Sequence, residues 1–345
     1  MMRIIRVRGK KAVRYLSCFI AFVLGASASL PLFAAEPLVV YSERKAFLIE
    51  PLFKRFTAET GIAVQVLADQ APVLMERLAA EGSHGQADLL MTVDAGNLWQ
   101  AAERGLLAPL KSPILERAVP SHLRDAKGRW FGLSLRARTL VYNPSKIQPS
   151  ELSSYEALAG PQFKGKLCLR SSKKVYNQSL IAMQIARLGV PKTEAMVRGW
   201  VANLAAPPFA DDTLVVQAVA SGQCVIGIVN TYYFARLAKD DPKLNARLFW
   251  ANQQAGGVHV NISGAGVLAS STQKADAQKL LEWLASNEAQ KQFAEANLEY
   301  PVNPAVKLAP IVASWGPYKS DLTHIEQSGR GQAEAVKLMD RAGWK

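Results

Sequence analysis

Two adjacent tyrosines, Tyr232 and Tyr233, lie in the segment Gly227-Ile-Val-Asn-Thr-Tyr-Tyr-Phe-Ala-Arg236. The apolar residues before them predict a buried strand that ends at Val229, and a helix is expected to begin near Tyr232. In a regular strand two neighbouring side chains point to opposite faces. At a strand-to-helix turn, both phenols can converge on one point beyond the end of the strand. The alternative is that one tyrosine packs in the core and the other lies at an interface.

A pair of phenols is a candidate ligand set for a metal ion. A phenol with a pKa of about 10 stays protonated at neutral pH. A highly charged cation that prefers oxygen can displace that proton, as metals do with bound water and thiols. Ferric iron is such a cation.

A second polar segment, Arg170-Ser-Ser-Lys-Lys-Val-Tyr-Asn-Gln-Ser179, lies between a predicted strand and a predicted helix. The side chains of Ser171, Ser172 and Asn177, with the amides at the helix start, could hold an anion. Tyr176 could add a third phenolate. Three phenolates and a small anion such as carbonate suit a hard trivalent cation, whereas softer metals prefer sulfur or imidazole. The alternative for Tyr176 is an aromatic ring that shields the strand end.

Residues 1–35 have the features of a secretory signal peptide. Six basic residues come first, an apolar run extends from Leu16 to Leu24, and small residues follow from Gly25 to Ala28. The apolar run is too short for a membrane span. We therefore expect a soluble protein that is exported to the periplasm.

The charge of the remaining chain is moderate. Without the six basic residues of the signal, the formal net charge falls from +13 to +7. No stripe of Lys and Arg interleaved with aromatic residues is present, so we do not expect nucleic-acid binding.

Two cysteines, Cys168 and Cys224, remain after the signal. An exported protein with two cysteines favours one disulfide. Both lie in predicted strands, 165–169 and 223–227, and adjacent strands would bring them within range. The alternative is two buried free thiols.

Strands and helices alternate along the rest of the chain, which predicts a parallel sheet covered by helices at the start of the fold. The predicted strands are 38–41, 62–67, 87–93, 166–170, 223–229 and 244–250. The predicted helices are 46–59, 72–81, 95–104, 179–188, 193–204, 213–220 and 274–295.

Two long extended segments, 131–142 and 257–268, predict strands that cross between two lobes. We therefore expect an α/β fold of two lobes, each a mixed sheet flanked by helices, joined by two crossing strands. The N-terminal lobe is then discontinuous, with residues 36–135 plus 264–345, and the C-terminal lobe contains residues 136–263. Such bilobal proteins close on a ligand by hinge motion.

The tyrosines lie where such a fold binds its ligand. In open α/β sheets, ligands bind at the carboxyl ends of the strands. Tyr41, Tyr176 and the pair Tyr232 and Tyr233 all lie at or just after predicted strand ends.

The chain resembles the periplasmic ferric-ion-binding proteins of bacterial ABC transporters, over essentially its whole length after the signal. The resemblance is carried by Val40-Tyr-Ser-Glu-Arg44, Asp88-Leu-Leu-Met-Thr-Val-Asp94, Leu135-Arg-Ala-Arg138, the Arg170–Ser179 segment and Asn230-Thr-Tyr-Tyr233. It implies a type II periplasmic-binding-protein fold and a monomer. It also implies that Tyr176, Tyr232 and Tyr233 bind Fe(III), and that Arg136 or Arg138 lies close to a synergistic carbonate or bicarbonate.

The chain departs from the family pattern at one place. Many relatives have His or Tyr after the Tyr-Ser-x-Arg motif as a ligand from the first lobe, but Lys45 and Ala46 follow Arg44 here. A protonated lysine is a poor ligand for iron. Tyr41, Glu43, or carbonate and water could complete the shell, and Arg44 could pair with the anion. The alternatives are that Tyr41 is a packed strand residue and Arg44 a surface residue.

We expect a high-affinity Fe(III)-binding protein that delivers iron to an ABC-transporter permease in the inner membrane. It is not expected to be an enzyme, because the sequence offers no recognisable set of nucleophile, base and orienting group. The alternative is the same scaffold with a phosphonate, a polyamine or another small organic solute as its ligand, which Lys45 and Ala46 favour.

Overall fold

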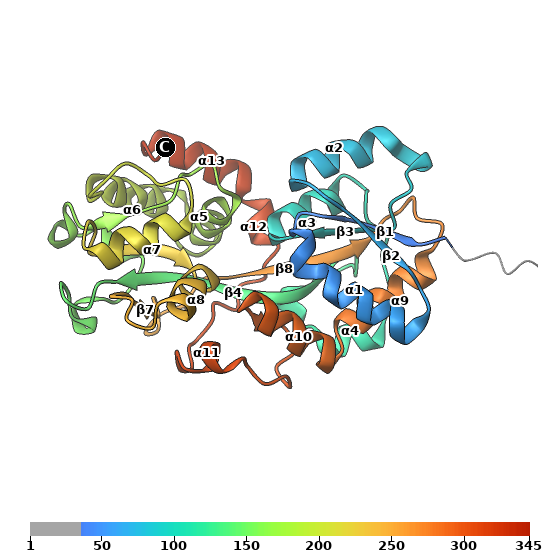
Figure 1. Cartoon of the computed structure of the whole chain (residues 1–345). Helices are drawn as coiled ribbons and strands as arrows, with labels where there is room; N and C mark the ends of the chain where they lie inside the picture. Colours follow the sequence, from blue (N-terminus) through green and yellow to red (C-terminus); the bar gives the residue numbers. More distant parts are fainter. Residues whose placement is uncertain (1–35) are drawn as a thin grey trace, which may run out of the picture. The chain divides into compact units, whose positions relative to one another are not determined.

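Helices and strands are interspersed throughout residues 36–345, the part of the chain that this computed structural model describes (Figure 1). The predicted signal peptide, residues 1–35, lies outside the described residues. Within residues 36–345, no helix combines the length and the hydrophobicity needed to cross a bilayer.

The strands form a mixed sheet in the order β2-β1-β3-β8-β4-β6-β5, with β7 and β9 each paired to β4. The pairs β1–β2, β1–β3 and β5–β6 are parallel, and β8 is antiparallel to both β3 and β4. The strands are β1 (Leu38–Ser42), β2 (Val64–Ala68), β3 (Leu89–Thr92), β4 (Phe131–Tyr142), β5 (Leu167–Cys168), β6 (Ile226–Asn230), β7 (Arg247–Phe249), β8 (Val260–Val267) and β9 (Tyr300–Pro301).

Helices cover this sheet. The α-helices are α1 (Ala46–Thr60), α2 (Ala71–Glu81), α3 (Ala95–Glu103), α4 (Pro113–Ala118), α5 (Val175–Leu188), α6 (Val190–Ala202), α7 (Asp212–Ser221), α8 (Thr231–Asp240), α9 (Lys274–Leu284), α10 (Asn287–Asn297), α11 (Pro310–Ala313), α12 (Gln327–Arg330) and α13 (Gln332–Arg341). Short 3-10 helices are η1 (Gly82–His84), η2 (Ser121–Leu123), η3 (Pro149–Glu151), η4 (Glu156–Ala159) and η5 (Pro161–Phe163).

Two elements differ from their predictions in ways that matter. The predicted helix 274–295 is two helices, α9 and α10, because Ser286 caps a new helix start by accepting a hydrogen bond from the Ala289 amide at 3.3 Å. Helix α5 begins at Val175 rather than at 179. Tyr176 therefore lies in the first turn of a helix, where its direction is fixed by the helix backbone.

The strands β4 and β8 pass between two hydrophobic cores. Phe131 and Leu133 of β4 belong to the first core, whereas Ala137 and Leu140 belong to the second. The first core takes its residues from 38–133 and again from 262–325. We propose that the two lobes meet at these two strands, as the extended segments in the sequence predict.

The last helix belongs to the second core rather than to the first. Ala335, Leu338 and Met339 of α13 pack with second-core residues, and the Trp344 ring meets the Trp200 ring edge-on at 5.9 Å. The sequence instead predicts that all of residues 264–345 belong to the N-terminal lobe. The apolar face of an amphipathic helix predicts burial but does not say against which core.

Candidate functional site

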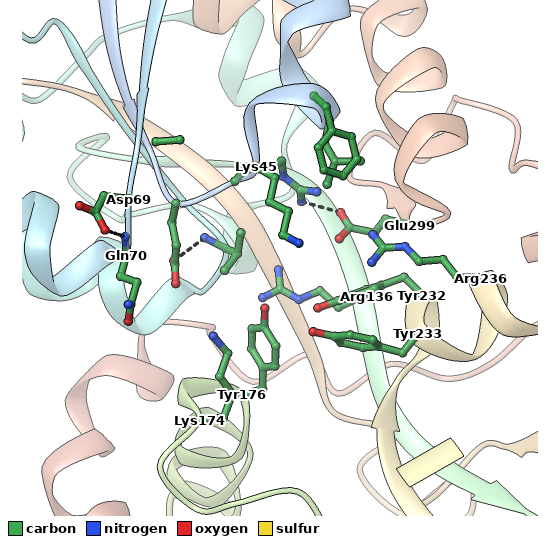
Figure 2. A pocket seen from close by; sticks show the side chains of 16 residues that line it. Lys45, Asp69, Gln70, Arg136, Lys174, Tyr176, Tyr232, Tyr233, Arg236 and Glu299 are labelled. Atoms are coloured by element: carbon green, nitrogen blue, oxygen red, sulfur yellow. Dashed lines mark hydrogen bonds and ion pairs between the residues drawn. The ribbon is translucent and has the colours of Figure 1, made fainter. Parts of the chain in front are cut away.

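A pocket of about 450 Å³ lies at the ends of several strands (Figure 2). One side is lined by residues that follow β1, β2 and β3, and the other by the first turns of α5 and α8. Arg136 of β4 lines it as well. The pocket therefore draws on elements from both cores.

The structure brings the three candidate tyrosines together in this pocket. Tyr232 and Tyr233 occupy the first turn of α8, which begins directly after β6 ends at Asn230. Their ring centroids lie 4.4 Å apart. Figure 2 shows the hydroxyls of both, and that of Tyr176 from α5, turned towards the same space beside Arg136. Because β5 and β6 are parallel, the segments that follow them leave the same edge of the sheet.

The surroundings of Tyr176 and Tyr232 raise the pKa of both phenols. Burial raises the pKa of Tyr232, and the nearby Tyr176 and Tyr233 hydroxyls raise it further because neighbouring phenolates repel each other. Burial likewise raises the pKa of Tyr176, with a further contribution from Tyr233. The Arg136 guanidinium opposes both shifts. A cation of high charge at this point would strongly favour the ionised phenols.

Arg136 is a buried cation that forms no salt bridge within residues 36–345, although its charge acts on the buried Asp94 carboxylate. Its side chain is 1% exposed, and its Nε and Nη2 atoms have no hydrogen-bond partner among residues 36–345. Its Nη1 atom is 3.4 Å from Ser263 Oγ, and its guanidinium carbon is 5.6 Å from the centre of the Tyr176 ring. An unpaired buried guanidinium is costly, and it favours an anion that two N–H groups can bind together.

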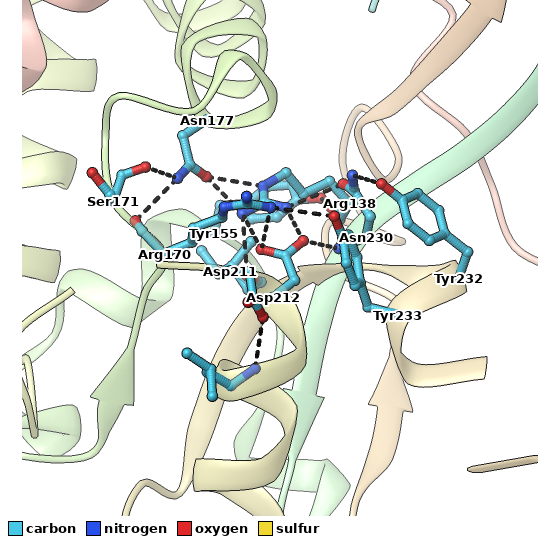
Figure 3. Close-up of polar contacts among 12 residues, drawn as sticks. Arg138, Tyr155, Arg170, Ser171, Asn177, Asp211, Asp212, Asn230, Tyr232 and Tyr233 are labelled. Atoms are coloured by element: carbon cyan, nitrogen blue, oxygen red, sulfur yellow. Dashed lines mark hydrogen bonds and ion pairs between the residues drawn. The ribbon is translucent and has the colours of Figure 1, made fainter. Parts of the chain in front are cut away.

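Arg138, two residues further along β4, is fully engaged elsewhere (Figure 3). Its Nη1 atom donates to Asp212 Oδ2 at 2.8 Å and to Asn230 Oδ1 at 3.1 Å. Its Nε and Nη2 atoms donate to Asn177 Oδ1 at 3.0 and 2.7 Å. Arg138 is not among the pocket residues, so of the two predicted anion-binding arginines only Arg136 is placed to act.

The other predicted anion ligands on the second polar segment, Ser171, Ser172 and Asn177, do not line the pocket. Asn177 Oδ1 accepts from Arg138, and its Nδ2 donates to the carbonyl oxygens of Arg170 and Ser171 at 3.1 and 2.9 Å. Ser171 Oγ accepts from the Lys173 amide at 3.4 Å. Neither residue lines the pocket. Their hydrogen bonds shape the loop before Tyr176 instead.

Tyr41 is not brought to the pocket. It is 2% exposed, its hydroxyl donates to Glu81 Oε1 at 2.8 Å, and the Arg77 guanidinium lies 5.1 Å from its ring centre. Alternation along β1 turns this side chain towards α2, so the prediction of Tyr41 as a ligand is not supported. The alternative, a packed strand residue, describes its position.

Arg44 lines the pocket but is already paired. Its Nη2 atom lies 2.9 Å from Glu299 Oε2, and its Nη1 donates to Asn297 Oδ1 at 2.6 Å. Both members of the ion pair are 4% exposed. Arg44 is therefore neither a surface residue nor a free cation for an anion.

Three further cations line the pocket, and of these Arg236 and Lys174 were not predicted. The guanidinium of Arg236 lies 5.0 Å from the Tyr232 ring centre and 5.9 Å from that of Tyr233. Lys174 Nζ lies 4.8 Å from the Tyr176 ring centre, and Lys45 points into the pocket in Figure 2. Arg236 follows Tyr232 by four residues on a predicted helix, so helical spacing would have found it.

Few carboxylates face the tyrosines. Glu43 lines the pocket, and its Oε2 accepts from the Val93 amide at 3.0 Å and from Asn97 Nδ2 at 3.2 Å. Asp69 and Gln70 line it as well. Across residues 36–345 no group of three or more His, Cys, Asp or Glu is placed to hold a metal ion. The phenols are therefore the main candidate metal ligands in the described chain.

Residues 51–319 match the family of bacterial extracellular solute-binding proteins. The chain belongs to this family. The solute-binding protein is 43% identical over 316 residues to iron uptake protein A1 of Synechocystis sp.. This match covers 90% of this chain and 88% of that relative.

Two solved structures are similar to this solute-binding protein. The Trichodesmium protein IdiA (FutA), in complex with iron and citrate ligands, is 44% identical with a TM-score of 0.87, covering 90% of this chain and 100% of that one. The ferric binding protein from Campylobacter jejuni is 34% identical with a TM-score of 0.84, covering 89% and 100%. These similarities confirm the predicted type II periplasmic-binding-protein fold and the resemblance to ferric-ion-binding proteins.

Proposed function

We propose that this solute-binding protein binds Fe(III) in the pocket through the phenolates of Tyr176, Tyr232 and Tyr233. It then delivers the iron to an ABC-transporter permease in the inner membrane, acting as a monomer in the periplasm. The convergence of three phenols beside Arg136, of which Tyr176 and Tyr232 are buried, carries this proposal. The names of the three relatives, all of which refer to iron, support it over an organic solute.

Binding and release follow from phenol chemistry. Each phenol must lose its proton to bind the ion, so loading releases protons and weakens as the pH falls. Reduction to Fe(II) lowers the charge that stabilises the phenolates. No covalent bond of a substrate is made or broken, so this function is not enzymatic.

Visible spectroscopy tests the proposal directly. Adding ferric citrate to the purified protein should produce a broad phenolate-to-iron charge-transfer band and a purple to red colour. A protein that stays colourless with ferric iron, with and without bicarbonate, would show that the phenols do not bind the ion.

A synergistic anion completes the proposed site at Arg136. Carbonate or bicarbonate fits the two free N–H directions of its guanidinium. A polycarboxylate is the second candidate, since the Trichodesmium relative was solved with iron and citrate. The pocket volume of about 450 Å³ leaves room for it beside the ion. Lys45, Lys174 and Arg236 could then bind its free carboxylates.

Replacing Arg136 by glutamine should weaken Fe(III) binding about tenfold to a hundredfold in bicarbonate, because the anion loses a charge-assisted, two-pronged partner. Affinity is measured by competition with a chelator, with and without bicarbonate. Arg104→Gln is the matched control, since Arg104 pairs with Glu76 at the surface. An Arg136→Gln protein with wild-type affinity and wild-type dependence on bicarbonate would contradict this role.

Replacing Tyr41 by phenylalanine should leave the affinity for Fe(III) within about twofold of the wild type. It should lower the free energy of unfolding by about 1 kcal/mol, because the hydrogen bond to Glu81 is lost. Iron titration and urea unfolding measure the two quantities. A large loss of affinity would instead make Tyr41 a ligand from the first core.

The organic-solute alternative retains one observation in its favour. Lys45 points into the pocket where many relatives have a His or Tyr ligand, so the pocket is rich in cations. Stabilisation by a ligand grows with its excess over the dissociation constant. A melting temperature that rises with phosphonates or polyamines, and not with ferric iron, would favour this alternative.

A further inference from the structure

The two segments that carry the tyrosines begin at the two cysteines. Tyr176 lies eight residues after Cys168, and Tyr232 lies eight residues after Cys224. The structure joins these cysteines in a disulfide, with their Cα atoms 5.9 Å apart. The disulfide therefore joins the two chain segments at the same distance, eight residues, before Tyr176 and before Tyr232.

Non-covalent pairing between these two paths is short. β5 contains only Leu167 and Cys168, and its ladder with β6 consists of two residue pairs, Leu167 with Ile226 and Cys168 with Gly227. A two-residue strand contributes few backbone hydrogen bonds, so it resists sliding or separation poorly by itself. The disulfide connects β5 to the segment directly before β6.

The bridge lies inside a hydrophobic core rather than at the surface. Cys168 and Cys224 are 0% and 1% exposed, and they pack in one cluster with Val215, Val219 and Val229. The backbones approach closely there, since a Cβ added at Gly227 would lie 3.2 Å from the Cys168 carbonyl oxygen. The packing ties β5, β6 and α7 into one unit below the tyrosines.

The Arg138 network is the second connection between the two paths. Arg138 bonds to Asn177, the neighbour of Tyr176, and to Asn230, which precedes Tyr232 by two residues. This polar connection lies close to the phenols, whereas the disulfide lies at the start of both paths. Because the disulfide and the Arg138 network lie at different positions along the two segments, they restrict both the separation and the rotation of one segment relative to the other.

We propose that the Cys168–Cys224 disulfide is a positioning element for the metal site, which holds Tyr176 in place relative to Tyr232 and Tyr233. The proposal rests on the proposed function. Ligand groups must keep their places within about 0.5 Å for tight binding, and ordering them before the ion arrives lowers the cost of binding. The bridge thus links oxidative formation of a disulfide to affinity for the ion.

The first test uses thiol counts on the exported, processed protein. Unfolded without reductant it should show no free thiol, and after reduction it should show two. Two free thiols before reduction would overturn the proposal.

The second test compares iron affinity in two variants that lack the bridge. Cys168→Ala/Cys224→Ala removes the link and leaves space, whereas Cys168→Ala/Cys224→Val removes the link and refills part of the space. Both should bind Fe(III) about tenfold more weakly by chelator competition and lose it faster, with a charge-transfer band at an unchanged wavelength. Wild-type affinity in the space-filling variant would show that the covalent link does not position the site.

Two further measurements keep the result interpretable. Val219→Ala is the matched control, because it removes volume from the same core without touching the link, and it should lose stability but keep its affinity. Hydrogen exchange in the wild type before and after phosphine reduction and alkylation should show faster exchange at 169–177 and 230–233. Equal exchange in both states would contradict the proposal, whereas a wild type that fails to bind iron would contradict the proposed function instead.

Discussion

Replacing both Tyr232 and Tyr233 by phenylalanine should abolish the visible charge-transfer band and lower the affinity for Fe(III) by about a thousandfold or more. The two substitutions remove two anionic oxygens from the proposed ligand set. The phenylalanine rings can keep the tilted ring–ring contact seen at 4.4 Å, so the fold should persist. Absorbance titration with ferric citrate, followed by competition with a chelator, measures both effects.

Each single variant, Tyr232→Phe or Tyr233→Phe, should lose less affinity for Fe(III) and less colour than the double variant. The Tyr233 hydroxyl accepts from Arg170 Nη1 at 3.4 Å, and the Tyr232 hydroxyl accepts from Asn230 Nδ2 at 3.4 Å, so each hydroxyl has a separate neighbour. Tyr142→Phe is the matched control, because Tyr142 is a buried β4 tyrosine outside the pocket. A double variant that keeps the colour and the affinity of the wild type would refute the proposed site.

Replacing Arg138 by methionine should lower the free energy of unfolding by about 3–5 kcal/mol, because it leaves the Asp212 carboxylate buried without its main cation. The two side chains are 1% and 0% exposed, and they meet at 2.8 Å. Arg170 lies 3.9 Å from Asp212 and offsets only part of the loss. Urea unfolding, monitored by tryptophan fluorescence, measures the change.

The same substitution should weaken iron binding, since Asn177 and Asn230 lose a shared partner beside the tyrosines. Adding Asp212→Asn to Arg138→Met should restore part of the stability, because the unpaired carboxylate is removed while Arg170 loses its partner at 3.9 Å. Arg129→Met is the control. Its ion pair with Asp125 lies at 2.8 Å in the first half of the chain, so its loss should cost stability without cost to affinity. Equal losses of affinity in the Arg129 and Arg138 variants would show that Arg138 has no specific role at the site.

Much of the fold could be predicted from the sequence, because buried apolar residues recur along it with the period of a helix or of a strand. The amphipathic stretch 46–59 became α1, and the long extended segments became β4 and β8, within a few residues. The break at Ser286 was not predicted, since the apolar pattern continues through it.

The tyrosines could be predicted because each follows a strand end, which is a local feature of the chain. The different surroundings of Arg136 and Arg138 could not be predicted, because the two residues are separated by one residue and have the same chemistry. Their difference depends on Asp212 and Asn177, which are distant in sequence. The sequence left Tyr41 open between a ligand and a packed strand residue for a similar reason, since its partner Glu81 lies on a separate helix.

The first core is assembled from two stretches that are distant in sequence, and this affects folding during synthesis of the protein. As the chain is synthesised from its N-terminus, the stretch from Leu38 to Leu133 appears long before the residues from Ile262 onward that complete its core. Strand β3 waits for its antiparallel neighbour β8, and until then its edge stays open to other chains. Contacts of such long range also slow folding. We therefore expect the first core to fold slowly until the residues from Ile262 onward are present.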